Sequence, residues 1–291
     1  MTFTLLVTSY DRQAELERLF CSISNQTFAD QIEVIYVNQN LVRPGSCDIL
    51  SESVKLTVLQ TDGRTSLSKA RNIGISKCSG DVVAFPDDDC WYEFNLLERI
   101  AYYFRDYPEV DCICTNIHDP DTNLNQGKRP VDVVRAVCFT NVFKMGGISS
   151  GIFVRNEALI YAGAYFDESL GAGTPLGSGE ETELLARLLS AGCRIEYVGY
   201  LQVYHPVPEY SHRDIHKSYR YGLGFGHLNG RLLRAGHLGV LWGFAEILTR
   251  SVAGVVVNIR SPIRRSVYWN RLAGALAGFI DAVAHSGLCE H

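Results

Sequence analysis

Short apolar runs alternate with amphipathic segments along the first 116 residues of the chain. The apolar runs are typical of buried strands and cover residues 3–8, 32–38, 54–60, 81–86 and 110–116. Segments 12–26, 67–77 and 94–105 lie between them, and the first has Leu16, Leu19, Phe20 and Ile23 at helical spacing. Strands separated by helices predict an α/β fold with a mostly parallel, Rossmann-like sheet and helices on both faces.

The pattern becomes less regular after residue 116. Residues 117–150 contain several glycines and prolines, which predicts a long loop over a binding site. A strand at 151–155, a glycine-rich loop at 169–179 and a helix at 180–191 follow, and then two short strands at 194–198 and 202–204. We therefore expect one α/β domain that ends near residue 210.

The tail at 211–291 has a different pattern. Residues 238–259 are strongly apolar but include Glu246 and Arg250, and a charge at the centre of a span costs about 2.5–3.5 kcal/mol. Residues 272–284 are too few to span a bilayer and include Asp281. Arg260, Arg264, Arg265 and Arg271 lie between these segments, which favours two amphipathic helices in a membrane interface. Helices that cap the globular domain, or a true span, are the alternatives.

The formal net charge of −5 is unevenly distributed. Residues 213–271 contain ten basic and two acidic side chains, a net +8, whereas residues 1–212 carry −11. The acidic body argues against nucleic-acid binding, and the basic tail favours an anionic membrane surface. The nine cysteines form no CxxC pair and the N-terminus lacks a basic start, so we expect a cytoplasmic protein at the inner face of the cell membrane.

Three consecutive carboxylates, Asp87, Asp88 and Asp89, follow the strand at 81–86. Neighbouring like charges repel one another, and a divalent cation removes that repulsion. Oxygen ligands suit Mg²⁺ or Mn²⁺, which also bind water and substrate phosphates. A solvated, Asp-rich turn is the alternative interpretation. Because ligands bind beyond the carboxyl ends of parallel strands, residues 8–12 and 38–40 are predicted to line the same site.

Other candidate groups come from three further segments. Arg71 lies on the predicted helix 67–77, where it binds a base or phosphate or serves as counter-ion of the Asp cluster. Glu180 and Glu181 begin a helix, where either one is a general base or both stabilise the helix dipole. His205 ends a predicted strand, where it is a metal ligand or a structural residue.

The ordered motifs resemble the inverting family-two glycosyltransferases, which have the GT-A fold. The matching segments lie within residues 3–206 and read LLVTSYDR, IEVIYVNQN, SLSKARNIGI, AFPDDDCWY, FDESLGAGTPLGSGEETELLARLL and VYHP. The resemblance implies transfer of a sugar from a nucleoside diphosphate sugar to an acceptor hydroxyl. The absence of QxxRW favours one sugar per encounter.

Position by position, the resemblance also implies roles for individual residues. The nucleotide-sugar-binding residues would be Thr8, Tyr10, Arg12, Asn38, Arg71, Asp87 and Asp88. Asn38 stands where the family usually has an Asp that contacts the base. The metal ligands would be Asp89, Asp88 and His205, with Mg²⁺ or Mn²⁺ as cofactor. Glu181 would be the catalytic base in place of the usual Asp, and Glu180 is the Glu before it.

The resemblance divides the chain into three parts. Residues 1–116 would bind the nucleotide sugar, residues 117–210 the acceptor, and residues 211–291 the membrane. The expected acceptor is a glycan or a lipid-linked molecule in surface polysaccharide or lipid-linked glycan assembly. A sugar nucleotidyltransferase and a catalytically inactive membrane scaffold are the alternatives.

Overall fold

The structure is a computed structural model that describes residues 1–42, 44–207 and 211–284. Within these ranges one ten-stranded sheet has the order β3-β2-β1-β4-β9-β6-β10-β5, with β7 beside β6 and β8 beside β10. The strands are β1 (Phe3–Ser9), β2 (Ile32–Asn38), β3 (Val54–Gln60), β4 (Val82–Ala84), β5 (Trp91–Tyr92), β6 (Cys112–Asp119), β7 (Leu124–Asn125), β8 (Val134–Ala136), β9 (Ile152–Arg155) and β10 (Ile195–Tyr204).

The longest strand pairs of the sheet are parallel. β2 pairs with β1 and β3, β4 pairs with β1, and β6 pairs with β10, all in parallel register. β9 lies antiparallel between β4 and β6. The predicted mostly parallel α/β sheet is therefore confirmed, with an antiparallel strand at its centre.

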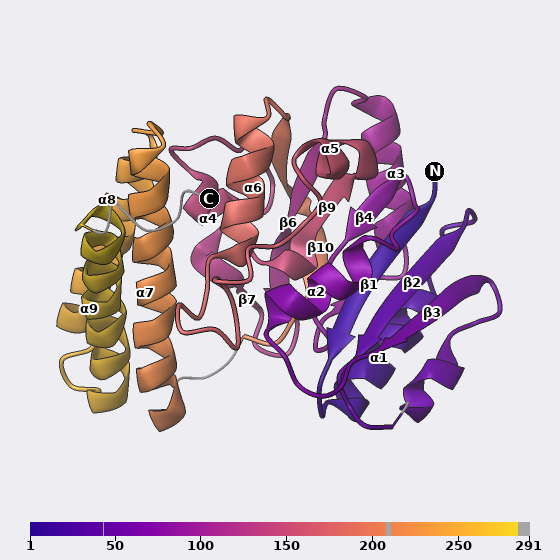
Figure 1. Ribbon diagram of the computed structural model, residues 1–291, viewed down its shortest axis with the longest axis horizontal. Coiled ribbons are helices and arrows are strands. Elements are labelled where there is room, and N and C mark those ends of the chain that lie inside the picture. Colours follow the sequence, from indigo (N-terminus) through magenta and orange to yellow (C-terminus); the bar gives the residue numbers. More distant parts are fainter. Residues whose placement is uncertain (43, 208–210, 285–291) are drawn as a thin grey trace.

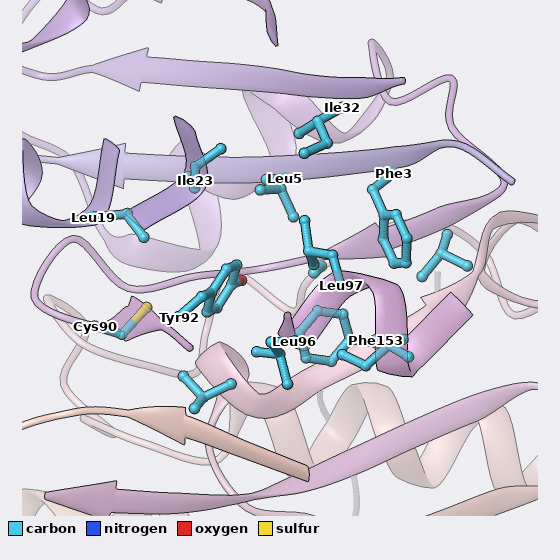
Figure 2. Packing of buried hydrophobic residues seen from close by; sticks show 14 of the residues in the cluster. Phe3, Leu5, Leu19, Ile23, Ile32, Cys90, Tyr92, Leu96, Leu97 and Phe153 are labelled. Carbon is cyan, nitrogen blue, oxygen red and sulfur yellow. The ribbon is translucent and has the colours of Figure 1, made fainter. Parts of the chain in front are cut away.

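Helices cover both faces of the sheet (Figure 1). They are α1 (Gln13–Ser24), α2 (Leu67–Ile75), α3 (Leu96–Asp106), α4 (Val142–Met145), α5 (Asn156–Tyr161) and α6 (Glu180–Ser190). Because side chains alternate along a strand, Leu5 joins the core beneath α1 and α3, whereas Leu6 joins the core beneath α2 and α6. Figure 2 shows the first core, where Leu19 of α1 and Leu96 of α3 pack toward Phe3 and Leu5.

Residues 117–150 contain more regular structure than the predicted long loop. The segment completes β6 and then forms β7, β8, α4 and the short 3₁₀ turns η2 (Gln126–Lys128) and η3 (Ser149–Gly151); a further turn, η1 (Gly45–Ile49), follows β2. The two short strands predicted at 194–198 and 202–204 are a single strand, β10, with a register shift between Val198 and Gln202. The glycines and prolines therefore lie at turns and at the register shift of β10. The pairing of β10 with β6 continues on both sides of that shift.

Three helices of the tail pack together at the end of the molecule opposite β3 (Figure 1). They are α7 (His212–Arg234), α8 (Val240–Val257) and α9 (Pro262–Ala284). At Gly226 of α7 and Gly274 of α9 an added Cβ would overlap backbone of the other helix, so these two helices approach closely. Two expectations need correction. Helix α7 was not predicted, and Arg264, Arg265 and Arg271 belong to α9 and not to a connector.

Among the described residues, Val240–Val257 alone is long and apolar enough to cross a membrane, with a mean hydropathy of 1.6. Its two charged side chains are Glu246 and Arg250. Glu246 pairs with Lys144 of α4 at 3.0 Å, and Arg250 donates to the carbonyl oxygen of Gly127 at 3.3 Å. The face of α8 with charges therefore contacts the α/β domain.

Candidate active site

The acidic triplet lies at the carboxyl end of the central parallel strands. β4 ends at Ala84, and Asp87 then forms an isolated parallel bridge with Thr8 at the end of β1. This pairing places the residues after β1 beside the triplet, as the strand-end rule predicts. Thr8 itself is only 7% exposed, so its side chain lies beneath the surface of the site.

Arg12 joins two of the three carboxylates. Its Nη1 atom donates to Asp88 Oδ1 at 3.1 Å and to Asp89 Oδ2 at 2.5 Å. Burial raises the pKa of Asp88 to about 6, although the charge of Arg12 opposes the rise. Two carboxylates thus converge on one positive group, which is the arrangement that a bound cation also requires.

His205 reaches the triplet because β5 pairs with the end of β10, where Tyr204 lies opposite Trp91. Its Nε2 atom lies 3.0 Å from Asp89 Oδ1, and its Nδ1 atom lies 2.7 Å from the carbonyl oxygen of Pro206. Burial would raise the pKa of Asp89, but the hydrogen bond and charge of His205, together with Arg12, lower it to about 2. Burial would lower the pKa of His205, but the hydrogen bond to Asp89 and the charges of Asp87 and Asp89 raise it. Asp89 is therefore ionised at neutral pH.

The third carboxylate, Asp87, accepts hydrogen bonds from Arg71 and Ser149. Arg71, only 1% exposed, donates from Nη2 to Asp87 Oδ1 at 3.0 Å and to Ser149 Oγ at 2.5 Å. Ser149 Oγ in turn donates to Asp87 Oδ1 at 3.1 Å. The structure thus shows the counter-ion contact of Arg71, while its Nη1 atom is buried without a hydrogen-bond partner among the described residues.

Glu180 and Glu181 begin helix α6, and the loop before this helix contacts the start of α2. In that contact Ser68 Oγ of α2 donates to the carbonyl oxygen of Leu170 at 2.7 Å. Glu180 is 3% exposed, and burial and then the charge of Glu181 raise its pKa well above the ordinary value, although Arg71 opposes the rise. A Cβ added at Gly171 would lie 2.7 Å from Glu180 Cδ and 2.9 Å from Ser68 Oγ, so the Glu180 carboxyl lies beside the start of α2, the helix that contains Arg71.

A cavity of about 260 Å³ opens beside Arg12. Asp11, Arg12, Asn40 and Pro44 are among its lining residues, and Asn38 is not. Asn38 is fully buried, donates to Gln60 Oε1 at 2.8 Å and accepts from the backbone N–H of Asn40 at 3.1 Å. Asn38 therefore does not line the cavity, and its hydrogen bond fixes the position of Asn40, which does.

Two further residues contact the groups described above. Asn40, within the predicted segment 38–40, lines the cavity and accepts from the backbone N–H of Asp11 at 2.8 Å. Ser149, which sequence reasoning missed, links Arg71 to Asp87. The motif IEVIYVNQN already contained Asn40, but nothing in the sequence ranked it above Asn38. Tyr10 is 42% exposed, with the Arg64 guanidinium 5.1 Å from its ring centroid.

The donor atoms at the triplet suit a divalent cation. Two carboxylates and an imidazole nitrogen meet there, and the contact of His205 Nδ1 with Pro206 leaves Nε2 directed at Asp89. In the part of the chain that the structure describes, no three His, Cys, Asp or Glu side chains form a ready metal-binding group. Mg²⁺ commonly takes only one or two carboxylates and fills its remaining positions with water and phosphate oxygens.

Solved structures show which fold class this arrangement belongs to. The mannosyltransferase PcManGT from Pyrobaculum calidifontis, in complex with GDP-Man and Mn²⁺, is similar with a TM-score of 0.66 at 15% identity. The alignment covers 96% of this chain and 87% of that one. S. aureus TarS 1-349, in complex with UDP-GlcNAc, has a TM-score of 0.60 at 15% identity, with 95% and 91% covered. The fold is that of the GT-A glycosyltransferases.

The sequence places the chain within that class. The sequence model of glycosyl transferase family 2 matches residues 4–160, and the chain belongs to this family. An uncharacterized glycosyltransferase of Haemophilus influenzae is 26% identical over 192 residues, which are 64% of this chain. The pre-mycofactocin glycosyltransferase of Mycobacterium tuberculosis is 25% identical over 202 residues, which are 67% of this chain. The matched regions span 61% and 40% of these relatives' lengths.

Proposed function

We propose that this protein transfers one sugar from a nucleoside diphosphate sugar to an acceptor hydroxyl, with inversion at the anomeric carbon. The observation that supports the proposal best is that helix α2 contacts both acidic segments. Arg71 of α2 hydrogen-bonds Asp87, and Ser68 of α2 donates to Leu170 in the loop before Glu180. This arrangement brings an Asp triplet suited to a cation near a second pair of carboxylates suited to proton transfer. Membership of glycosyl transferase family 2 supports the same reaction class.

In this proposal the donor lies across the ends of β1 and β4. The cavity beside Arg12 would take the nucleoside, with Asn40 and Tyr10 near the base, Asn38 as the support of Asn40, and Thr8 beneath. Asp89, Asp88 and His205 would hold Mg²⁺ or Mn²⁺. The bound cation would neutralise charge that grows on the leaving diphosphate.

Arg12 has a specific task in this arrangement. In the structure its guanidinium neutralises Asp88 and Asp89, and its side chain is 47% exposed. With a cation held by the two carboxylates, Arg12 would be free to contact the diphosphate, where its fork of donors fits phosphate oxygens. Arg71 and Ser149 would keep Asp87 oriented through their hydrogen bonds.

Glu181 removes the proton from the attacking acceptor hydroxyl in this proposal. Burial and then the charge of Glu181 raise the pKa of Glu180 beside it, so Glu180 favours the neutral form. The attack comes from the face opposite the leaving group, and one displacement inverts the anomeric configuration. Ser178, two residues before Glu180, donates to the carbonyl oxygen of Tyr221 of α7 at 2.8 Å, so α7 would border the acceptor side.

The deciding experiment identifies the released product. The protein is incubated with nucleoside diphosphate sugars and Mn²⁺ or Mg²⁺, with EDTA as the matched control. A transferase releases nucleoside diphosphate only when the cation is present. Release of inorganic diphosphate from a nucleoside triphosphate and a sugar phosphate would instead establish the nucleotidyltransferase. No turnover and no nucleoside diphosphate binding would establish the inactive scaffold.

We also propose that the outer face of α8 and α9 contacts an anionic membrane, where a lipid-linked acceptor would be presented during glycan assembly. Exposed apolar side chains on this face include Trp242, Val257 and Ile280, at 72%, 81% and 63%. Arg264 and Arg265 lie on the first turn of α9, which follows the end of α8 in the chain. This arrangement favours a cytoplasmic protein held peripherally, because the charges of α8 point to the α/β domain.

Flotation with vesicles of phosphatidylcholine and phosphatidylglycerol tests the membrane contact. Val257→Asp should reduce flotation strongly, because it places a charge on the apolar face. Ile160→Asp is the matched control, since Ile160 is 63% exposed on α5 of the α/β domain. Wild-type protein that stays in the unbound fraction at low salt would overturn this proposal.

A further inference from the structure

Arg129 is a buried cation without a counter-ion among the residues that the structure describes. Its residue is only 8% exposed, and its Nε and Nη1 atoms are buried without a hydrogen-bond partner in the described part of the chain. Its one described ring contact is with Tyr197, whose ring centroid lies 5.9 Å from the guanidinium carbon. A buried charge without a partner is costly, so this side chain is suited to bind a group that brings negative charge.

A second arginine approaches the same turn. Arg250 of α8 donates from Nη2 to the carbonyl oxygen of Gly127 at 3.3 Å, two residues before Arg129. Burial and then the positive charge of Arg250 lower the pKa of Arg129, although Tyr197 and Cys114 oppose the shift. Arg250 has one described acidic neighbour, Glu246 at 3.7 Å, which also pairs with Lys144 at 3.0 Å. The local balance of charge is therefore positive.

The backbone of Gly147 lies directly against the guanidinium of Arg129. Gly147 has φ of +83°, and an added Cβ would lie 2.6 Å from Arg129 Nη1. Ser149, two residues further on, donates to Asp87 in the candidate active site. The unpaired cation thus lies beside the site, on the side where α8 meets the domain.

We propose that Arg129 and Arg250 bind a phosphate group. Two guanidinium groups match the charge and the oxygen geometry of a phosphate. The phosphate would belong to the acceptor, because the proposed donor diphosphate lies at Asp87–Asp89 and the apolar face of α8 turns toward the proposed membrane. That assignment to a lipid-linked acceptor rests on the proposed function, whereas binding of the anion does not.

Thermal unfolding of the full chain in EDTA tests the anion site. EDTA prevents cation-mediated binding of phosphate at the Asp triplet, and sodium chloride keeps the ionic strength constant. Inorganic phosphate, geranyl phosphate and uncharged geraniol are titrated separately. A ligand that binds the folded state raises Tm with its concentration, so both phosphates should raise it and geraniol should not.

Three variants distinguish binding from a general salt effect. Arg129→Met should abolish the phosphate-dependent rise in Tm, and its Tm without phosphate should equal or exceed that of the wild type. Arg250→Met should weaken apparent phosphate affinity at least about fivefold. Arg105→Met is the control and should keep the full rise, because Arg105 is 66% exposed on α3 and pairs with Asp106.

Each outcome has a defined meaning. No saturable rise in the wild type, or an unchanged rise in Arg129→Met, overturns the anion site. If Arg129→Met does not fold, a full rise in both Arg129→Lys and Arg250→Met overturns it. Geranyl phosphate affinity at least about tenfold above that of inorganic phosphate supports a lipid source, and equal affinity overturns that source alone. Failure to find transferase activity leaves all these results unaffected.

Discussion

The two acidic clusters of the site contain the same chemical group in opposite surroundings. Asp88 and Asp89 accept hydrogen bonds from Arg12, and His205 and Arg12 lower the pKa of Asp89 to about 2. Glu180 is almost fully buried, has an unsatisfied Oε2 atom, and has its pKa raised well above the ordinary value by burial and by Glu181.

The different surroundings suit the Asp cluster to binding a cation and the Glu pair to proton transfer. A carboxylate that stays ionised holds cations and opposes the charge of a metal–diphosphate pair. A buried pair that favours one proton is suited to accept or release it near neutral pH. In the proposed mechanism, the environments of the two clusters, more than their residue types, would determine which task each one performs.

The largest effect is expected at Asp89. Asp89→Ala removes the carboxylate that contacts both Arg12 and His205, so metal-dependent turnover should fall below detection. The measurement is nucleoside diphosphate release with Mn²⁺. Asp106→Ala, on an exposed residue of α3, should retain full activity. Substantial turnover in Asp89→Ala would remove the triplet from the mechanism.

Glu181→Gln is expected to have the next largest effect. General base catalysis contributes roughly 10²–10⁴-fold, so kcat should fall by about that factor while donor binding changes little. Steady-state kinetics and calorimetric titration with nucleoside diphosphate measure the two quantities. Glu157→Gln, in the first turn of α5, is the matched control. An unchanged kcat in Glu181→Gln would exclude it as the base.

Gly224→Ala perturbs the Glu pair without touching the triplet. An added Cβ on α7 would overlap the carbonyl oxygens of Leu176 and Ser178 in the loop before Glu180. Overpacking of this kind costs about 1–3 kcal/mol, so denaturant unfolding should show a loss of that size and turnover should fall. Gly243→Ala is the control, because its nearest neighbour is a Phe143 side-chain atom at 3.2 Å. Equal stability of the two variants would show that α7 does not position the loop.

Glu180→Gln should give the smallest effect, a change in the pH dependence of stability. Because the folded state raises the pKa of Glu180, the stability it contributes is fully present below its unfolded value near 4.5. That contribution is lost as the pH rises through the folded pKa. Glu180→Gln stays neutral, so its Tm should exceed that of the wild type by a few degrees at pH 7 and by less at pH 4.

Glu183→Gln is the control for this prediction. Glu183 lies on the same helix but pairs with Arg187 at 2.8 Å, so its substitution should lower Tm at pH 7. A wild type and Glu180→Gln that unfold identically at every pH would show that Glu180 is not held in its neutral form.

The local pattern predicted the strands and helices of the α/β domain well, but it missed features that depend on distant partners. β5 is only two residues long and exists because it pairs with the end of β10. Helix α7 contains several glycines, which disfavour an isolated helix, and its close contact with α9 makes those glycines favourable. Local propensity contains no information about either partner.

The sequence by itself predicted that residues 8–12, 38–40 and Asp87–Asp89 lie at one edge of the sheet, because the hydrophobic period marks where each parallel strand ends. The resemblance to the family added Arg71 and the Glu pair. Only the tertiary structure decided that Asn38 lies behind Asn40, that Ser149 contacts Asp87, and that Arg129 is buried without a counter-ion among the described residues. Those outcomes depend on burial and on the direction of side chains from separate elements, and neither quantity is encoded in local spacing.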